Sequence, residues 1–132
     1  NASELTWDLA GWRVTDHAED SFVVELSMPL PPGGRAVFGR SSDIAVNGGV
    51  DVDVAYGVAM LLENGSDSLA LYPPAGEEPL EVPIDSVTWD GGALWPDPVG
   101  ASMALEPNLT DALINQLAAI GCHQARLQGQ FA

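Results

Sequence analysis

Short apolar runs, each closed by glycine or proline, follow one another along most of this 132-residue chain. Within several runs apolar and polar residues alternate, which places successive side chains on opposite faces of a β-strand. Glycine and proline supply the turns between such strands. The pattern therefore predicts an all-β chain of antiparallel strands. The predicted strands are 9–14, 22–26, 36–38, 50–56, 69–72, 82–89 and 103–105.

The same alternation selects the side chains that face the interior. We predict a core that contains Leu9, Trp12, Phe22, Val24, Phe38, Leu69, Leu71 and Val87.

The last part of the chain changes period. Leu113, Leu117 and Ile120 lie at helical spacing, and Asn108 is a residue type that caps helix N-termini. We therefore expect one β-sandwich domain over 1–107, followed by a short C-terminal helix and tail over 108–132.

The charge is strongly acidic. Nineteen aspartates and glutamates stand against four arginines and no lysine, for a formal net charge of −15. Such a chain repels the phosphates of nucleic acids and anionic lipid headgroups, so we expect no nucleic-acid partner. The longest apolar run, 54–62, is too short to insert across a bilayer.

One metal site is conceivable from spacing. Asp51 and Asp53 share a strand face, about 7 Å apart by strand rise, and two carboxylates so placed can bind calcium together with loop carbonyls. The segment does not complete the calcium-loop pattern, because Ala55 and Tyr56 stand where a further oxygen ligand and a glycine are needed. A solvated strand face with no metal is the competing interpretation.

Other reactive residues are few. His17 lies in a polar loop, and His123 directly follows Cys122, the only cysteine, so neither histidine forms a recognisable catalytic pair. The serine-hydrolase elbow, the phosphate-binding loop and the dinucleotide glycine pattern are missing from the sequence. We expect no enzymatic activity and no resident cofactor, apart from the calcium already considered.

The tryptophans offer a different kind of site. Trp12 and Trp89 lie in strand patterns and are predicted to be core residues, whereas Trp7 and Trp95 lie in turn-rich segments. We predict the latter two as surface rings, which can stack on a sugar.

Six segments together resemble the bacterial form of the lamin tail domain, and they cover about residues 1–107. They are Asp8–Asp16, Leu30–Arg40, Asn47–Val50, Leu62–Leu71, Asp85–Trp89 and Gly100–Leu105. The resemblance implies an antiparallel immunoglobulin-like β-sandwich with no catalytic residues. It also implies that the opening strands of the family lack a counterpart before Asn1, which would leave a sheet edge unpaired.

The resemblance also implies a role. Bacterial members are accessory modules of larger secreted or cell-surface proteins, so we expect a non-catalytic binding or adhesion module with an extracellular location. Its partner would be a protein or a surface glycan, beside the attached domains of the parent protein. The alternatives are a structural spacer without a ligand and, less favoured, a fragment of a calcium-assisted hydrolase.

Overall fold

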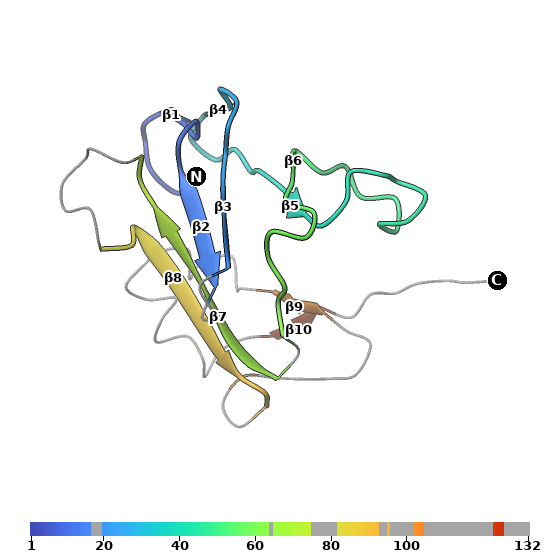
Figure 1. Cartoon of the computed structure of the whole chain (residues 1–132). Coiled ribbons are helices and arrows are strands. Elements are labelled where there is room, and N and C mark those ends of the chain that lie inside the picture. The colour runs from blue at the N-terminus through green and yellow to red at the C-terminus, as the bar shows by residue number, and fades with distance from the viewer. Residues whose placement is uncertain are drawn as a thin grey trace.

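The computed structural model describes residues 1–16, 20–63, 65–74, 82–92, 95, 102–104 and 123–125. Regular structure in these residues is entirely β-strand, with no helix among them, so the predicted all-β class is confirmed (Figure 1). The strands are β1 (Trp7–Asp8), β2 (Arg13–Asp16), β3 (Ser21–Val23), β4 (Pro29–Leu30), β5 (Phe38–Gly39), β6 (Val54–Ala55), β7 (Ser66–Tyr72), β8 (Asp85–Asp90), β9 (Ser102–Ala104) and β10 (His123–Ala125).

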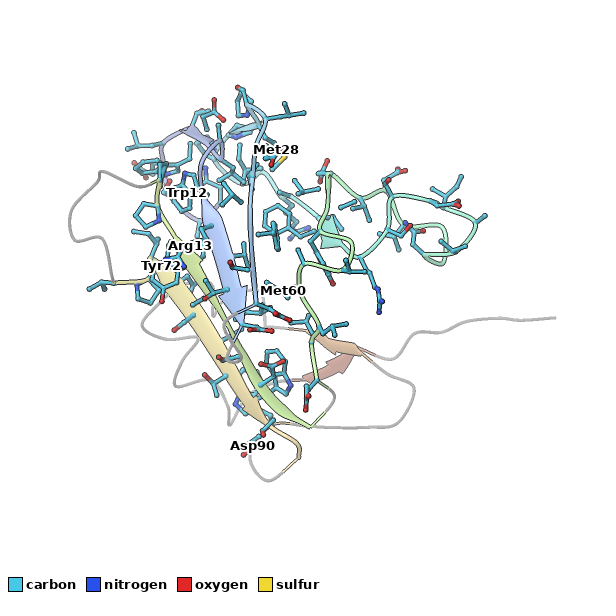
Figure 2. The ribbon with its side chains drawn as sticks, viewed as in Figure 1. Trp12, Arg13, Met28, Met60, Tyr72 and Asp90 are labelled. Atoms are coloured by element: carbon cyan, nitrogen blue, oxygen red, sulfur yellow. The ribbon has the colours of Figure 1, made fainter. Side chains whose placement is uncertain are left out.

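The largest sheet has four strands in the order β3-β2-β7-β8, and every neighbouring pair in it is antiparallel. β7 and β8 pair over six positions, from Ser66 opposite Asp90 to Leu71 opposite Asp85. Between β2 and β7 the guanidinium of Arg13 lies 4.4 Å from the ring centroid of Tyr72, its direct cross-strand partner (Figure 2). This side of the sheet is therefore held by long ladders and by cross-strand side-chain contact.

Asp67 is a buried carboxylate within β7, on the strand face that alternation also assigns to Leu69 and Leu71. Its two oxygens accept hydrogen bonds from the backbone N–H groups of Glu63 (2.9 Å) and Ser68 (2.7 Å). These bonds explain how a carboxylate is accommodated in the sheet, since a buried polar group must be paired.

A β-bulge joins the start of β2 to the end of β3. The N–H of Gly11 donates to the carbonyl of Val24 (2.8 Å), and the N–H of Val24 donates to the carbonyl of Trp12 (2.9 Å), so two residues oppose one. Gly11 has φ +81°, and a Cβ there would lie 3.2 Å from the Cβ of Pro74. Glycine is required here both for its backbone angle and for the close approach of another chain segment.

The bulge turns Trp12 into the main hydrophobic cluster. Leu9, Trp12 and Val24 are buried in that cluster, as predicted. Half-buried side chains packed against it are Met28, Leu30, Ala36, Phe38, Val54 and Leu71. The other predicted core residues are also only half-buried, namely Phe22, Leu69 and Val87.

The N-terminal strand is fastened by one carboxylate. Asp8 Oδ2 accepts a hydrogen bond from the Ser27 hydroxyl (2.7 Å), and Oδ1 accepts from the N–H groups of Ala10 (3.0 Å) and Met28 (2.8 Å). The Ser27 bond, followed by the two backbone bonds, lowers the pKa of Asp8 below its ordinary value. Asp8 therefore ties β1 to the segment that leads into β4.

β5 and β6 form a separate two-stranded pair that runs parallel, unlike the antiparallel pairing predicted for all strands. The connection 40–53 is long enough to carry the chain back in the same direction, which a tight hairpin cannot do. The predicted strand 50–56 is shortened to Val54–Ala55, although exposed and half-buried residues alternate from Asp51 to Ala55. Asp53 supports the pair, because its Oδ2 accepts from the N–H of Val37 (2.7 Å).

The predicted strand over 22–26 ends early, and the predicted C-terminal helix is not tested. Leu26 is 79% exposed, because the chain bends there instead of continuing the strand predicted over 22–26. The predicted C-terminal helix falls outside the described residues. Within the predicted tail, however, β10 pairs antiparallel with β9, an association that the sequence did not indicate.

Candidate binding groove

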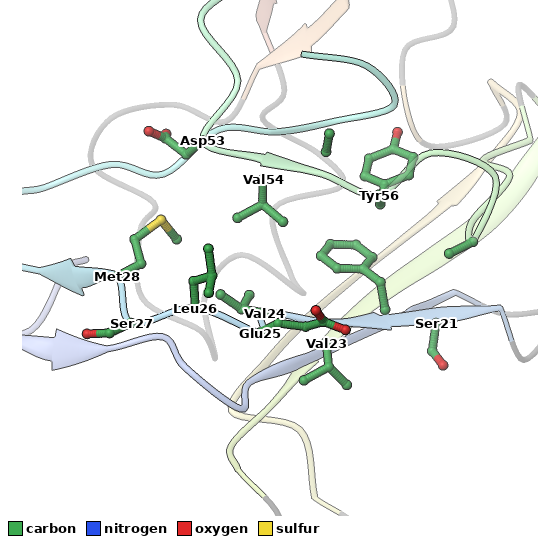
Figure 3. A pocket seen from close by; sticks show the side chains of 13 residues that line it. Ser21, Val23, Val24, Glu25, Leu26, Ser27, Met28, Asp53, Val54 and Tyr56 are labelled. Carbon is green, nitrogen blue, oxygen red and sulfur yellow. The ribbon is translucent and has the colours of Figure 1, made fainter.

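A groove of about 770 Å³ lies between β3 with the segment after it and the region around β6 (Figure 3). Its size falls within the range of about 300–1,000 Å³ typical of ligand sites. The residues that line it are Ser21, Phe22, Val23, Val24, Glu25, Leu26, Ser27, Met28, Asp53, Val54, Ala55, Tyr56 and Ala59.

Aromatic rings connect the two sides of the groove. The ring of Phe22 stacks on that of Tyr56, with centroids 5.4 Å apart and planes inclined by 20°. The same ring meets Phe38 edge-on at 5.5 Å. Phe22 on β3 thereby packs against Phe38 on β5 and Tyr56 just after β6, which gives the groove an apolar base.

No strand among the described residues pairs with the groove side of β3. Within the described sheet β3 is an edge strand, with β2 as its neighbour. Because the N–H and C=O of Val24 both bond to the Gly11–Trp12 bulge, the C=O of Val23 and the N–H of Glu25 point the other way across their trans peptide units. These two groups are an acceptor and a donor available to a further strand.

Among the described residues that line the groove, the ionisable side chains are acidic or phenolic. Glu25 and Asp53 supply carboxylates, Tyr56 supplies a hydroxyl, and none of these described residues is an arginine or a histidine. Both carboxylate residues are exposed. A groove of this kind attracts cationic groups and disfavours anionic ones.

The predicted calcium pair is only partly associated with this groove. Asp53 lines it and is already engaged with Val37 N–H, whereas Asp51 is exposed and is not among the lining residues. The described residues contain no group of three or more His, Cys, Asp or Glu side chains placed to hold a metal ion. Calcium binding by Asp51 and Asp53 stays a prediction.

The tryptophans divide differently from the prediction. Trp7 is 41% exposed, packs edge-on against Trp12 at 6.0 Å and donates from Nε1 to the Ser3 hydroxyl (2.9 Å). Trp95 is only 8% exposed, so its predicted surface position is wrong. The backbone N–H of Trp95 donates to Asp90 Oδ1 (3.1 Å), which holds the residue against the end of β8. Trp89 is half-buried.

The structure does not test the remaining candidates as a site. His17 and Cys122 fall outside the described residues, and His123 is described only through the backbone of β10. Apart from Asp53, the sequence did not single out the groove residues as a site. The usable signal was aromatic residues in two short strand patterns, Phe22 and Tyr56, but their proximity depends on tertiary packing.

Comparison with protein-family models, with curated proteins and with solved structures gives no match for this chain. In the described residues no helix is long and apolar enough to cross a membrane.

Proposed function

We propose that this chain is a non-catalytic binding module of a larger secreted or cell-surface bacterial protein, built on the immunoglobulin-like sandwich of the lamin tail family. The four-stranded antiparallel sheet and the separate β5–β6 pair are consistent with two layers of such a sandwich. The observation that carries the binding role is the open groove beside β3, whose apolar base and polar backbone edge suit recognition of a partner.

The charge supports an extracellular setting for this role. A net charge of −15 keeps a protein soluble, and the ions of an extracellular medium screen the mutual repulsion of its carboxylates. A structural spacer without a ligand is the alternative function. It would need neither an open groove nor an exposed strand edge, whereas a binding module uses both.

The proposal is tested by screening the purified chain against arrays of extracellular peptides and glycans, and by measuring each binder again in solution. The groove is blocked with Ala59→Trp, at an exposed residue that lines it. Val58→Trp is the matched control, because Val58 is 84% exposed, adjacent in sequence and outside the lining.

We expect at least one binder that loses about tenfold or more in affinity with Ala59→Trp, equivalent to about 1.4 kcal/mol. The same binder should keep its affinity for Val58→Trp. No binder at all, or binders that both variants retain equally, would favour the spacer.

A further inference from the structure

We propose that the ligand of this groove is an extended peptide that carries basic side chains at alternate positions. It adds as a further strand to the edge of β3 that no described strand occupies. The inference rests on the proposed binding function and names the class of partner. Its three supports are the direction of the backbone groups, the shape of the groove and the sign of its charge.

The backbone support comes from hydrogen bonds on the opposite side of β3. The bonds of Val24 to the bulge, at 2.8 and 2.9 Å, fix the C=O of Val23 and the N–H of Glu25 as outward-facing groups. Alternation along the strand turns the N–H of Val23 outward as well. An incoming strand therefore meets donors and acceptors at the spacing of a β-ladder, which is how sheet edges recognise peptides.

The shape support comes from the opposite wall. A strand added to β3 would lie about 4.8 Å from it, and this space is bounded by β6 and the segment up to Ala59. Side chains of the peptide on the face shared with Phe22 and Val24 would meet the aromatic base formed with Tyr56. These positions favour apolar residues in the peptide.

The charge of the groove indicates which peptide side chains should be basic, namely those on the face of β3 opposite Phe22 and Val24. Val24 is 2% exposed and Glu25 is exposed, so Glu25 points to the face opposite the core. A peptide residue across from Glu25 points to the same face, where an opposite charge stabilises a cross-strand pair and a like charge destabilises it. Asp53 adds a second carboxylate to the lining, and no described lining residue supplies a cation to offset either one. Basic residues at every second position of the peptide fit this arrangement.

The test uses a capped peptide of about seven residues in which lysine alternates with valine, near the usual length of a strand. Binding to the ¹⁵N-labelled full chain is followed by NMR titration up to about 1 mM peptide, which detects dissociation constants up to about 1 mM. We expect the amide signals of Val23 and Glu25 to shift most. A matched peptide with glutamate in place of lysine should bind at least about tenfold more weakly.

Val23→Pro removes an outward N–H without removing a bond to β2, since proline is tolerated on edge strands. We expect it to weaken binding of the lysine peptide about tenfold, whereas Val23→Thr, which keeps the N–H, should not. A melting curve for each variant confirms that the fold is retained. Unchanged affinity with a folded Val23→Pro variant would overturn strand addition.

Other outcomes are equally decisive. No shift of either amide at about 1 mM peptide, or equal binding of the glutamate peptide, would refute the inference. So would self-association of the chain alone that protects the Val23 and Glu25 amides, because a second copy would then occupy the edge. Binding of a glycan that is abolished by Ala59→Trp but unaffected by Val23→Pro would refute the peptide ligand. It would leave the proposed binding function standing.

Discussion

The two sides of the molecule are held together in different ways. On the β7–β8 side, hydrogen-bonded ladders run over six paired positions and continue through β2, so most of the organisation is backbone pairing. On the β3–β6 side the strands are two or three residues long, and the rings of Phe22, Phe38 and Tyr56 connect them. Side chains, and no described backbone pairing, connect β3 to β6, and this leaves between β3 and β6 the groove that is the candidate site.

The largest expected effect comes from the residue at the junction of the two sides. Trp12→Ala removes a buried ring from the cluster with Leu9 and Val24, and we expect it to lower the free energy of unfolding by about 3–5 kcal/mol. Chemical denaturation measures the change. Trp7→Ala, at a 41% exposed ring that contacts Trp12, is the control and should cost clearly less. Equal effects of the two variants would contradict a core centred on Trp12.

Phe22→Ala tests whether rings, and not backbone pairs, hold the groove side. The substitution removes both ring contacts of a half-buried side chain, so we expect a loss of roughly 2–3 kcal/mol, below that for a fully buried phenylalanine. Denaturation gives the value, and NMR should show perturbed signals for Phe38 and Tyr56 with an intact β7–β8 ladder. If the amide signals of β7 and β8 were lost as well, the rings on the groove side would also be needed to hold the β7–β8 ladder.

Gly11→Ala probes the bulge that links the two sides. Alanine at φ +81° is strained by about 1–2 kcal/mol, and its Cβ would also crowd Pro74 at 3.2 Å. Gly33→Ala is the matched control, because Gly33 has φ +72° and a Cβ added there would meet no atom within 4 Å. We expect Gly11→Ala to lower the melting temperature more than Gly33→Ala does, and the difference measures the close approach of Pro74. Equal decreases in the melting temperatures of the two variants would show that the positive φ accounts for the whole effect and that contact with Pro74 adds nothing.

The contrast between the two sides also explains what the sequence could predict. Local alternation identified the strand positions of Leu69 and Leu71, and it placed Leu9, Trp12 and Val24 in the core, because these depend on period and nearby turns. It did not indicate the parallel direction of β5–β6, the pairing of β9 with β10 or the burial of Trp95. Each of these depends on contacts between segments far apart in sequence. The groove belongs to the same class, since only packing brings Phe22 beside Tyr56.

Asp8 connects pH to the clasp between β1 and the segment before β4. Its pKa is lowered in the folded chain, first by the Ser27 hydroxyl and then by the N–H groups of Ala10 and Met28. A lowered folded pKa means that the stabilisation is present above the unfolded pKa and is lost as the pH falls through the folded value. We expect Asp8→Asn to lower the melting temperature near pH 7, with the difference from wild type disappearing at strongly acidic pH. A difference that is constant with pH would show that the carboxylate charge plays no part.

The smallest effect is expected from calcium on the groove side. Because the chain has a net charge of −15, added salt should raise its melting temperature by screening the repulsion among its carboxylates. Sodium at equal ionic strength should then match calcium. Asp53 Oδ2 already accepts the N–H of Val37, and Asp51 is exposed, so neither observation sets this pair apart from other surface acids. Thermal melts with millimolar calcium in a constant sodium background separate screening from a site, since only specific binding stabilises by mass action there. A calcium-dependent rise that disappears in the Asp51→Asn/Asp53→Asn double variant would establish the pair as a metal site beside the groove. Asp53, which lines the groove, would then bind a cation other than a peptide lysine.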